Sequence, residues 1–244
     1  MNYELKVKIF VLAIFAVFVV VFSVSAQIVP KPDFFLFWSA DTYIPNDYPG
    51  KSLPVYDSWV TVTAVVSGKN INPDKMVYYW WVNGQFQEEA TGLGRKNFRY
   101  HIDIVPPGAN IAIKASIENE NKSIDLEKTI VITTATPEVG LYQYNPAAKR
   151  VSAEVGEKYD AKFGEQMSFM AKPFFFSVQK ISDLIFRWRP EGGGEIESKD
   201  NVFNLKIPVS EDVEEFLSGF DLSVENPFSS VQKEFASVSL NITK

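Results

Sequence analysis

Few residues of this sequence have side chains that could perform catalysis. Its 244 residues include no Cys and one His, His101. Without Cys there is no thiol nucleophile and no Cys-based zinc site, and a single His excludes a multi-His metal centre. His101 lies in the alternating segment Phe98-Arg99-Tyr100-His101-Ile102. The alternation places it on a polar strand face beside Arg99, so we expect a solvated histidine.

Acidic residues are the other candidates for chemistry, and they gather in two clusters, Glu195/Glu197/Asp200 and Glu211/Asp212/Glu214/Glu215. Glycosidases need two carboxylates at a defined separation, and calcium sites usually draw six or more oxygens from Asp-rich loops. Neither pattern is visible, and Gly192-Gly193-Gly194 lacks the Lys-Ser/Thr of a phosphate loop. We expect solvated clusters, no catalytic residue, no metal, no cofactor and no enzymatic activity. Calcium at an acidic cluster stays the open alternative.

The charge balance bears on the class of partner. There are 24 Lys and Arg residues against 30 Asp and Glu residues, a net charge of −6. A nucleic-acid-binding protein usually carries a basic face, so this balance argues against nucleic acid as a partner. With 46% hydrophobic and 22% charged residues, the composition is that of a folded protein.

The N-terminal residues predict export. Ile9 to Phe22 are consecutively apolar, Lys6 and Lys8 precede them, and Ser23-Val24-Ser25-Ala26 follows. A basic start, a short apolar run and small residues before a cut describe a signal peptide, here cleaved between Ala26 and Gln27. The apolar stretch 9–26 is also long enough, at the short end, for an uncleaved membrane anchor. In both cases we expect the rest of the chain to be exported.

An internal repeat organises the rest of the sequence. Tyr79-Trp80-Trp81-Val82-Asn83-Gly84 is similar to Phe186-Arg187-Trp188-Arg189-Pro190-Glu191-Gly192, and Ser116-Ile117-Glu118-Asn119 to Ser223-Val224-Glu225-Asn226. Aligning Trp81 with Trp188 gives both pairs a period of 107 residues. The segments from Phe98 and from Phe203 match after a small insertion or deletion. The matches indicate a duplicated unit.

The apolar period within each unit is two, as in half-buried antiparallel strands. The predicted strands span 33–39, 59–66, 76–82, 97–105, 110–118 and 128–134 in the first unit, and 139–145, 165–171, 183–189, 201–208, 219–225 and 235–243 in the second. Short strands separated by Gly- and Pro-rich turns, in units of about 100 residues, are typical of a β-sandwich. Residues 210–217 are the exception, with a spacing that predicts one helical turn.

The motif of an aromatic residue, a spacer, Trp and a turn resembles the third strand of immunoglobulin-like domains. Tyr79-Trp80-Trp81 and Phe186-Arg187-Trp188 are similar to this strand in polycystic-kidney-disease and REJ-type domains of microbial surface proteins. The Gly-Asp-Gly turn common in that type is Val82-Asn83-Gly84 here and is lost in the second unit. The resemblance implies an all-β chain with two tandem immunoglobulin-like β-sandwiches after an N-terminal signal or anchor helix. The expected segments are 1–26, 27–136 and 137–244.

The resemblance also implies which aromatic residues fill the two cores. A Trp of the third strand packs between the sheets in such folds, so we expect Trp81 and Trp188 to be buried. Phe98 and Phe203 are the expected core residues of a later strand. Alternation then places Trp80 on the opposite face from Trp81, partly exposed. It could pack against a neighbouring strand or bind a partner.

Two further segments are candidate binding surfaces. The long segment 39–58 contains Tyr43, Tyr48 and Tyr56 among three prolines, and Pro-rich loops lose little entropy on binding. Its alternative role is to cover an edge strand. The run Lys172-Pro173-Phe174-Phe175-Phe176 cannot direct all three rings into one core, so we expect one to contact a neighbouring loop or the other domain.

These observations favour an exported, non-enzymatic binding or spacer module of the cell envelope or cell surface. The expected partner is an envelope or surface protein, with a membrane contact through residues 9–26 if they are not cleaved. The alternative is a carbohydrate-binding module, because exposed aromatic rings on an acidic β-sandwich suit a glycan.

Overall fold

The computed structural model describes residues 32–69, 71–103 and 106–244. Residues 1–26, for which the sequence predicts a signal or anchor, lie outside these ranges. Phe34–Val66 and Asn72–Lys244 form one compact unit. Its elements are β1 (Asp33–Ala40), β2 (Ser58–Ser67), η1 (Pro73–Lys75), β3 (Val77–Val82), β4 (Gln85–Phe86), η2 (Glu88–Ala90), β5 (Gly92–Leu93), β6 (Asn97–Ile102), β7 (Asn110–Glu118), β8 (Asp125–Thr133), β9 (Glu138–Asn145), β10 (Arg150–Glu154), β11 (Lys158–Lys162), β12 (Gln166–Phe174), η3 (Ile181–Asp183), β13 (Ile185–Pro190), β14 (Ile196–Ser198), β15 (Val202–Lys206), β16 (Glu215–Glu225) and β17 (Lys233–Thr243).

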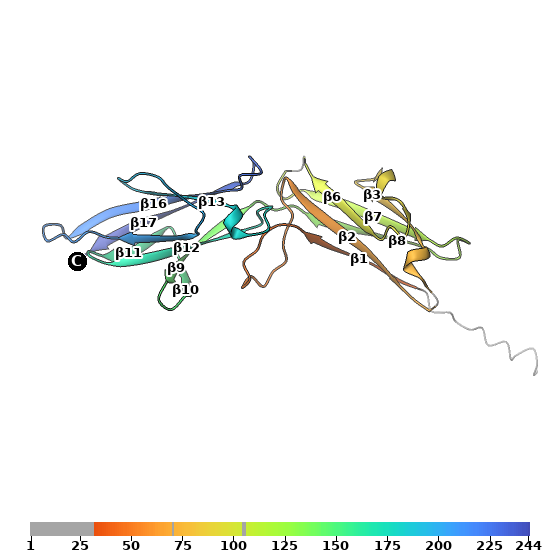
Figure 1. The fold of residues 1–244 in the computed structure, drawn as a ribbon, viewed down its shortest axis with the longest axis horizontal. Coiled ribbons are helices and arrows are strands. Elements are labelled where there is room, and N and C mark those ends of the chain that lie inside the picture. Colours follow the sequence, from red (N-terminus) through yellow and green to blue (C-terminus); the bar gives the residue numbers. More distant parts are fainter. Residues whose placement is uncertain (1–31, 70, 104–105) are drawn as a thin grey trace, which may run out of the picture. The chain divides into compact units, whose positions relative to one another are not determined.

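The strands up to β8 form two sheets (Figure 1). One sheet has the order β1-β2-β6, and the other has the order β4-β3-β7-β8, with β5 added beside β3. Labelled A to G along the chain, these are an A-B-E sheet and a C′-C-F-G sheet. This is the strand order of an immunoglobulin-like or fibronectin-type sandwich.

The strands from β9 onward repeat this arrangement with two additions. Their sheets have the orders β10-β9-β12-β15 and β11-β17-β16-β13-β14. The A, B and E strands are β9, β12 and β15, and β10 extends this sheet by forming a hairpin with β9. The other sheet contains the C, C′, F and G strands, and β11 pairs in parallel with the last strand, β17. The protein is therefore all-β, with two immunoglobulin-like strand sets in tandem.

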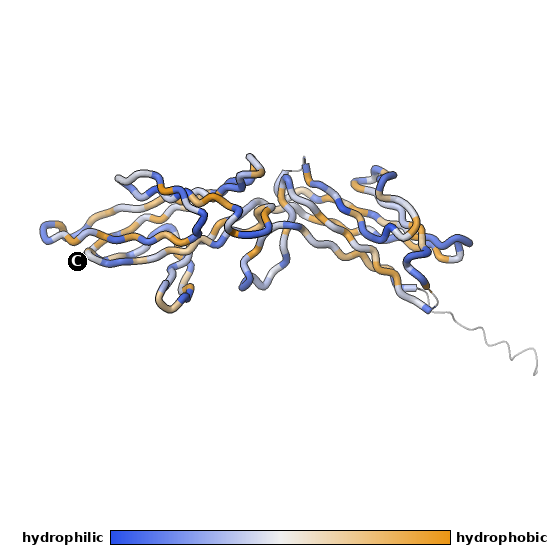
Figure 2. Tube along the Cα trace, in the orientation of Figure 1, coloured by the Kyte–Doolittle hydropathy of each residue, from blue (hydrophilic) through white to orange (hydrophobic). Residues whose placement is uncertain are grey.

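Equivalent residues of the two strand sets pair in the same way. Val62 of β2 pairs with Phe98 of β6, and Phe169 of β12 pairs with Phe203 of β15. Offsets of 107 and 105 residues relate these positions, as the repeat in the sequence does. Side chains pointing inward and outward alternate along the strands, and hydrophobic and hydrophilic positions alternate with them (Figure 2).

The core of the first strand set corrects one prediction. Trp80 is fully buried and stacks on Phe98, with ring centroids 5.3 Å apart. Trp188 is buried in the same way against Phe203, at 5.1 Å. Trp80 is therefore the equivalent of Trp188. The expectation that Trp81 fills the core while Trp80 is exposed is wrong.

The error is a slip of one residue in the third strand. Residues 77–82 are Val-Tyr-Tyr-Trp-Trp-Val, so both faces of β3 are apolar and alternation alone does not choose between them. A slip of one residue moves every side chain to the opposite face. In the pairing of β3 with β7, Trp80 lies opposite Ala115, and in the pairing of β13 with β16, Trp188 lies opposite Leu222. The offset between the two strand sets is therefore 108 residues for the Trp and 107 residues for the residue opposite it.

A second expectation is also wrong. Residues 210–217 form no helical turn, because β16 begins at Glu215 and Phe216 pairs with Ile242 of β17. Pairing with a long neighbouring strand outweighs the weak helical spacing, as tertiary contacts often override local propensity. The alternation did predict strands at β1, β2, β3, β6, β7, β8, β9, β12, β13, β15, β16 and β17, whereas it missed the short strands β4, β5, β10, β11 and β14.

Candidate functional site

The outer face of the β4-β3-β7-β8 sheet carries a group of aromatic and aliphatic side chains. We call it the aromatic face and define it by Tyr79, Trp81, Phe86, Leu93, Lys114 and Val131. Tyr78 and Trp80 point into the core, so their neighbours in β3, Tyr79 and Trp81, point outward. The pairings Trp81 with Phe86, Trp81 with Lys114, and Val77 with Leu93 extend this face across the sheet.

A tight hairpin places Phe86 beside Trp81. Asn83 and Gly84 have φ angles of 48° and 81°, which a two-residue turn with a left-handed backbone requires. The ring centroids of Trp81 and Phe86 are 5.5 Å apart, and those of Tyr79 and Trp81 are 6.4 Å apart. Phe86 is 49% exposed, Leu93 67% and Val131 58%. The row of rings therefore has solvent-accessible apolar ends.

Charged groups of β7 and β8 lie among these rings. The Lys114 ammonium is 4.2 Å from the centre of the Trp81 ring, a cation–π contact, and 3.7 Å from the Glu127 carboxylate. The Tyr79 hydroxyl donates a hydrogen bond of 2.6 Å to Glu118. This bond, followed by desolvation and the negative charge of Glu118, raises the pKa of Tyr79.

The composition of the aromatic face is that of a protein-binding surface. Protein interfaces are enriched in Tyr, Trp and Phe at the centre, and the most important contacts often come from Trp and Tyr. The charged groups that lie among the rings are mixed in sign, which suits orientation of a partner more than recognition of an ion. The sequence signal for this face was the Asn83-Gly84 turn, which pairs Trp81 with Phe86 once the hairpin is recognised.

The residues proposed from the sequence as binding residues lie elsewhere. Trp80 is in the core, where its indole N–H donates to the carbonyl of Arg95 at 3.0 Å. Tyr43 forms a β-bridge with Phe176, and the ring of Tyr48 lies 5.3 Å from that of Phe174. The run 172–176 therefore contacts the segment 39–58, which confirms the prediction that it contacts a neighbouring loop or the other domain.

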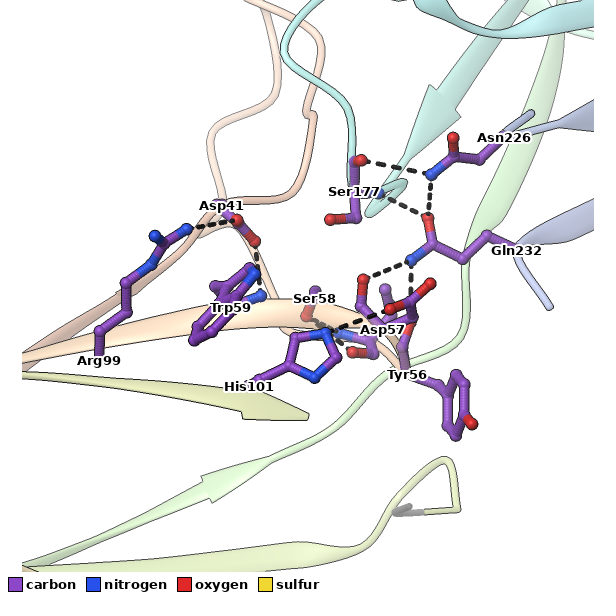
Figure 3. A network of polar contacts seen from close by, with 11 residues as sticks. Asp41, Tyr56, Asp57, Ser58, Trp59, Arg99, His101, Ser177, Asn226 and Gln232 are labelled. Carbon is purple, nitrogen blue, oxygen red and sulfur yellow. Dashed lines mark hydrogen bonds and ion pairs between the residues drawn. The ribbon is translucent and has the colours of Figure 1, made fainter. Parts of the chain in front are cut away.

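Tyr56 belongs to a polar network around the loop that precedes β2 (Figure 3). The buried side chain of Gln232 donates to the carbonyls of Tyr56 and Asp57, at 2.8 and 3.2 Å. Its amide oxygen accepts from the backbone N–H of Ser177 and from the side chain of Asn226. The ring of Tyr56 is 40% exposed. The backbone of this loop therefore serves an internal contact.

His101 lies at the edge of the same network (Figure 3). Its Nε2 is 3.1 Å from a carboxylate oxygen of Asp57, and its ring lies 4.7 Å from that of Trp59. Asp41 accepts a bond from the Trp59 backbone and lies 3.6 Å from Arg99. These partly exposed groups bind one another, and their arrangement orders the start of β2.

The predicted core residues and acidic clusters can also be placed. Trp188, Phe98 and Phe203 are buried. Glu195 and Glu197 pair with the guanidinium groups of Arg187 and Arg189 on the outer face of β13. In the part of the chain that the structure describes, no group of three or more acidic or His side chains could hold a metal ion. Within the same residues, no helix has the length and apolar character needed to cross a membrane.

Comparisons with known proteins give fold-level likenesses. No protein-family model matches the sequence, and no curated protein matches it. Among solved structures, the chain is similar to the three N-terminal domains of the bacteriophage RB49 outer capsid protein Hoc, at 12% identity and a TM-score of 0.47, covering 86% of this chain and 59% of that one. It is also similar to the ectodomain of mouse nectin-like molecule 4, at 10% identity and a TM-score of 0.34, covering 88% of this chain and 65% of that one. The immunoglobulin-like assignment follows from the strand order above and does not depend on these likenesses.

Proposed function

We propose that this chain is an exported, non-enzymatic immunoglobulin-like module that binds a protein partner at the cell envelope or cell surface. In this proposal residues 1–26 direct export, by cleavage or as an anchor, and residues 27–136 and 137–244 are two tandem modules. The sequence motif of β3 and β13 supports a kinship with polycystic-kidney-disease and REJ-type domains of microbial surface proteins.

The aromatic face is the observation that carries the proposal. Its rings stand on a sheet whose inner side is fixed by the buried residues Tyr78, Trp80 and Ile113. A rigid, pre-formed surface loses little conformational entropy on binding. The face therefore supplies what a binding module needs, which is accessible apolar and aromatic area on a sheet with a well-packed inner side.

The binding test compares two sets of substitutions on the same exported chain. We expect Trp81→Ala with Phe86→Ala to reduce recovery of the partner from an envelope extract at least about tenfold, since the loss of an aromatic residue that is a hot spot of an interface costs about 2 kcal/mol or more. Phe235→Ala is the matched control, because Phe235 is 64% exposed on β17, outside the aromatic face. Thermal melts should show that all variants fold. Equal recovery with and without Trp81 and Phe86 would contradict the proposed site.

A further inference from the structure

A polar cavity of about 580 Å³ lies on the outer side of the β10-β9-β12-β15 sheet, beside the β9–β10 hairpin. The hairpin extends away from the sheet (Figure 1). We call the site the hairpin cavity and define it by Tyr144, Ser152, Gln166, Ser168, Asn204 and Lys206. Its volume is within the range of about 300–1,000 Å³ that is usual for small-ligand sites.

Three side chains in one row across the sheet form the centre of the cavity. Ser168 of β12 pairs with Tyr144 of β9 on one side and with Asn204 of β15 on the other. Their neighbours Phe169 and Phe203 point into the core, so this row faces outward. The Ser168 hydroxyl lies 2.6 Å from the amide oxygen of Asn204. Because the hydroxyl donates that bond, the amide N–H₂ group of Asn204 is left to donate to a ligand.

The hairpin supplies the wall and is held by its own turn. The side-chain oxygen of Asn145 accepts from the backbone N–H of Ala148 at 3.0 Å, and Lys149 has a φ of 48°. The pairing of β10 with β9 shifts register between Val151 and Glu154. Ser152 lies within this irregular stretch and lines the cavity, as β-bulges often redirect a side chain toward a site.

The ring of Tyr144 differs from that of its neighbour Tyr142. Lys172 lies over the Tyr142 ring, at 4.7 Å from its centre. Among the described residues, no aromatic ring stacks on Tyr144 and no cation lies over its ring, which lines the cavity. Tyr144 therefore offers a ring and a phenol group on one side of Ser168, with the amide of Asn204 on the other side.

The side chains that line the cavity do not favour a charged ligand. Its central groups are hydroxyls, amides and a phenol, and the charged residues Glu165 and Lys206 are opposite in sign. A neutral ligand with many hydroxyl groups matches this surface, because hydroxyls both donate to and accept from amides. The C–H face of a sugar ring is also an apolar surface that an aromatic ring can cover.

We infer that the hairpin cavity is a binding site for a neutral saccharide. This inference goes beyond the proposed protein partner and does not depend on it, because the two sites use different sheets and share no residue. The protein would then contact a partner through the aromatic face and a glycan through the hairpin cavity.

A glycan array of neutral and acidic oligosaccharides, followed by titration calorimetry of the full exported chain, tests the inference. The expected result is binding of a neutral oligosaccharide. We expect Tyr144→Ala and Asn204→Ala each to raise the dissociation constant of this oligosaccharide about tenfold, as for the loss of one aromatic or hydrogen-bond contact. Asn204 is exposed and Tyr144 half-buried, and Asn204→Ala also removes the acceptor of the Ser168 hydroxyl, so thermal melts must show that both variants stay folded.

Phe235→Ala is the control on the opposite sheet of the same strand set, and Trp81→Ala with Phe86→Ala is the control for the aromatic face. Neither should change saccharide binding. Three results would overturn the inference: no neutral saccharide bound at millimolar concentration, binding of acidic saccharides alone, or binding unaffected by Tyr144→Ala. If any of these results is found while Trp81→Ala with Phe86→Ala still reduces recovery of the protein partner, the saccharide site is refuted and the proposed function is not.

Discussion

Trp80 and Trp81 are adjacent in β3 but have opposite environments. Trp80 is fully buried, stacks on Phe98 and has its indole N–H bonded to the carbonyl of Arg95. Trp81 points outward, where Lys114 lies over its ring. The two residues should therefore differ strongly in what their loss costs.

We expect Trp80→Ala to lower the free energy of unfolding by about 3–5 kcal/mol, the usual cost of deleting a large aromatic side chain from a core. Trp81→Ala should cost less than about 1.5 kcal/mol, because Trp81 loses only surface contacts. Chemical denaturation followed by circular dichroism measures both values. A larger loss for Trp81 than for Trp80 would restore the register expected from the sequence and refute the one described here.

The Tyr79–Glu118 hydrogen bond gives a second prediction at this scale, which concerns high pH. The pKa of Tyr79 is raised in the folded protein, chiefly by this bond. The folded state therefore holds the phenol proton more tightly than the unfolded state, and the stabilisation is complete below about pH 10 and is lost as the pH rises through the folded value. Glu118→Gln should move the pKa of Tyr79 down toward its ordinary value. A ¹³C NMR titration of the tyrosine ring carbons tests this, and an unchanged Tyr79 titration would contradict it.

The two strand sets differ in whether a further strand covers the edge of the last strand, β8 in the first set and β17 in the second. The outer edge of β17 is covered by β11 over five pairs, from Lys158–Ser239 to Lys162–Thr243. In the part of the chain that the structure describes, β8 pairs with β7 alone. Just past its end, the backbone N–H of Ala135 bonds the carbonyl of Pro54. The residues Thr129-Ile130-Val131-Ile132-Thr133 carry no charge, Pro or Gly, which are the usual protections of an edge.

We therefore expect Val131→Lys to slow aggregation under mildly denaturing conditions, with the free energy of unfolding changed by less than about 0.5 kcal/mol at this exposed position. Val231→Lys is the control, because Val231 is 53% exposed but lies outside the strands. Light scattering during incubation measures the effect. If both substitutions slowed aggregation equally, the effect would come from the added charge and not from protection of the β8 edge.

Local alternation predicted most strands but could not fix the register of β3. The pattern in β2, where inward and outward residues alternate as Val62, Thr63 and Ala64, assigns each face without ambiguity. In β3 both faces are apolar, and only the pairing with the neighbouring strand determines which face points into the core. The aromatic face was missed for this reason, although its residues were all visible in the sequence. The hairpin cavity depends on β10, whose five residues Arg-Val-Ser-Ala-Glu do alternate, but this strand is short and its two apolar side chains, Val151 and Ala153, are small and not buried in the core.

At the scale of the whole molecule, contacts between residues far apart in sequence determine what the long segment 39–58 does. Gln232 is 176 residues from Tyr56, whose carbonyl it binds, and Tyr48 packs on Phe174 and Phe175. Its prolines and tyrosines suggested a binding loop. No local pattern could reveal these partners, because the contacts depend on the folded arrangement of both strand sets.

Gln232→Ala should lower the free energy of unfolding by about 1–3 kcal/mol, since the partly buried N–H of Ser177 and the carbonyl groups of Tyr56 and Asp57 lose their partner. Hydrogen–deuterium exchange should rise at residues 55–58 and 176–178. Exchange unchanged in both segments would show that this network does not order them.

Photo-crosslinking shows whether the outer face of β3, β4, β7 and β8 binds a protein partner. A photoreactive phenylalanine analogue would replace Phe86 in one variant and Phe235 in another, each irradiated in the cells that produce it. We expect one protein adduct at position 86 that excess unlabelled chain competes away, with no such adduct at position 235. The absence of an adduct at 86, or the same competed adduct at both positions, would contradict it.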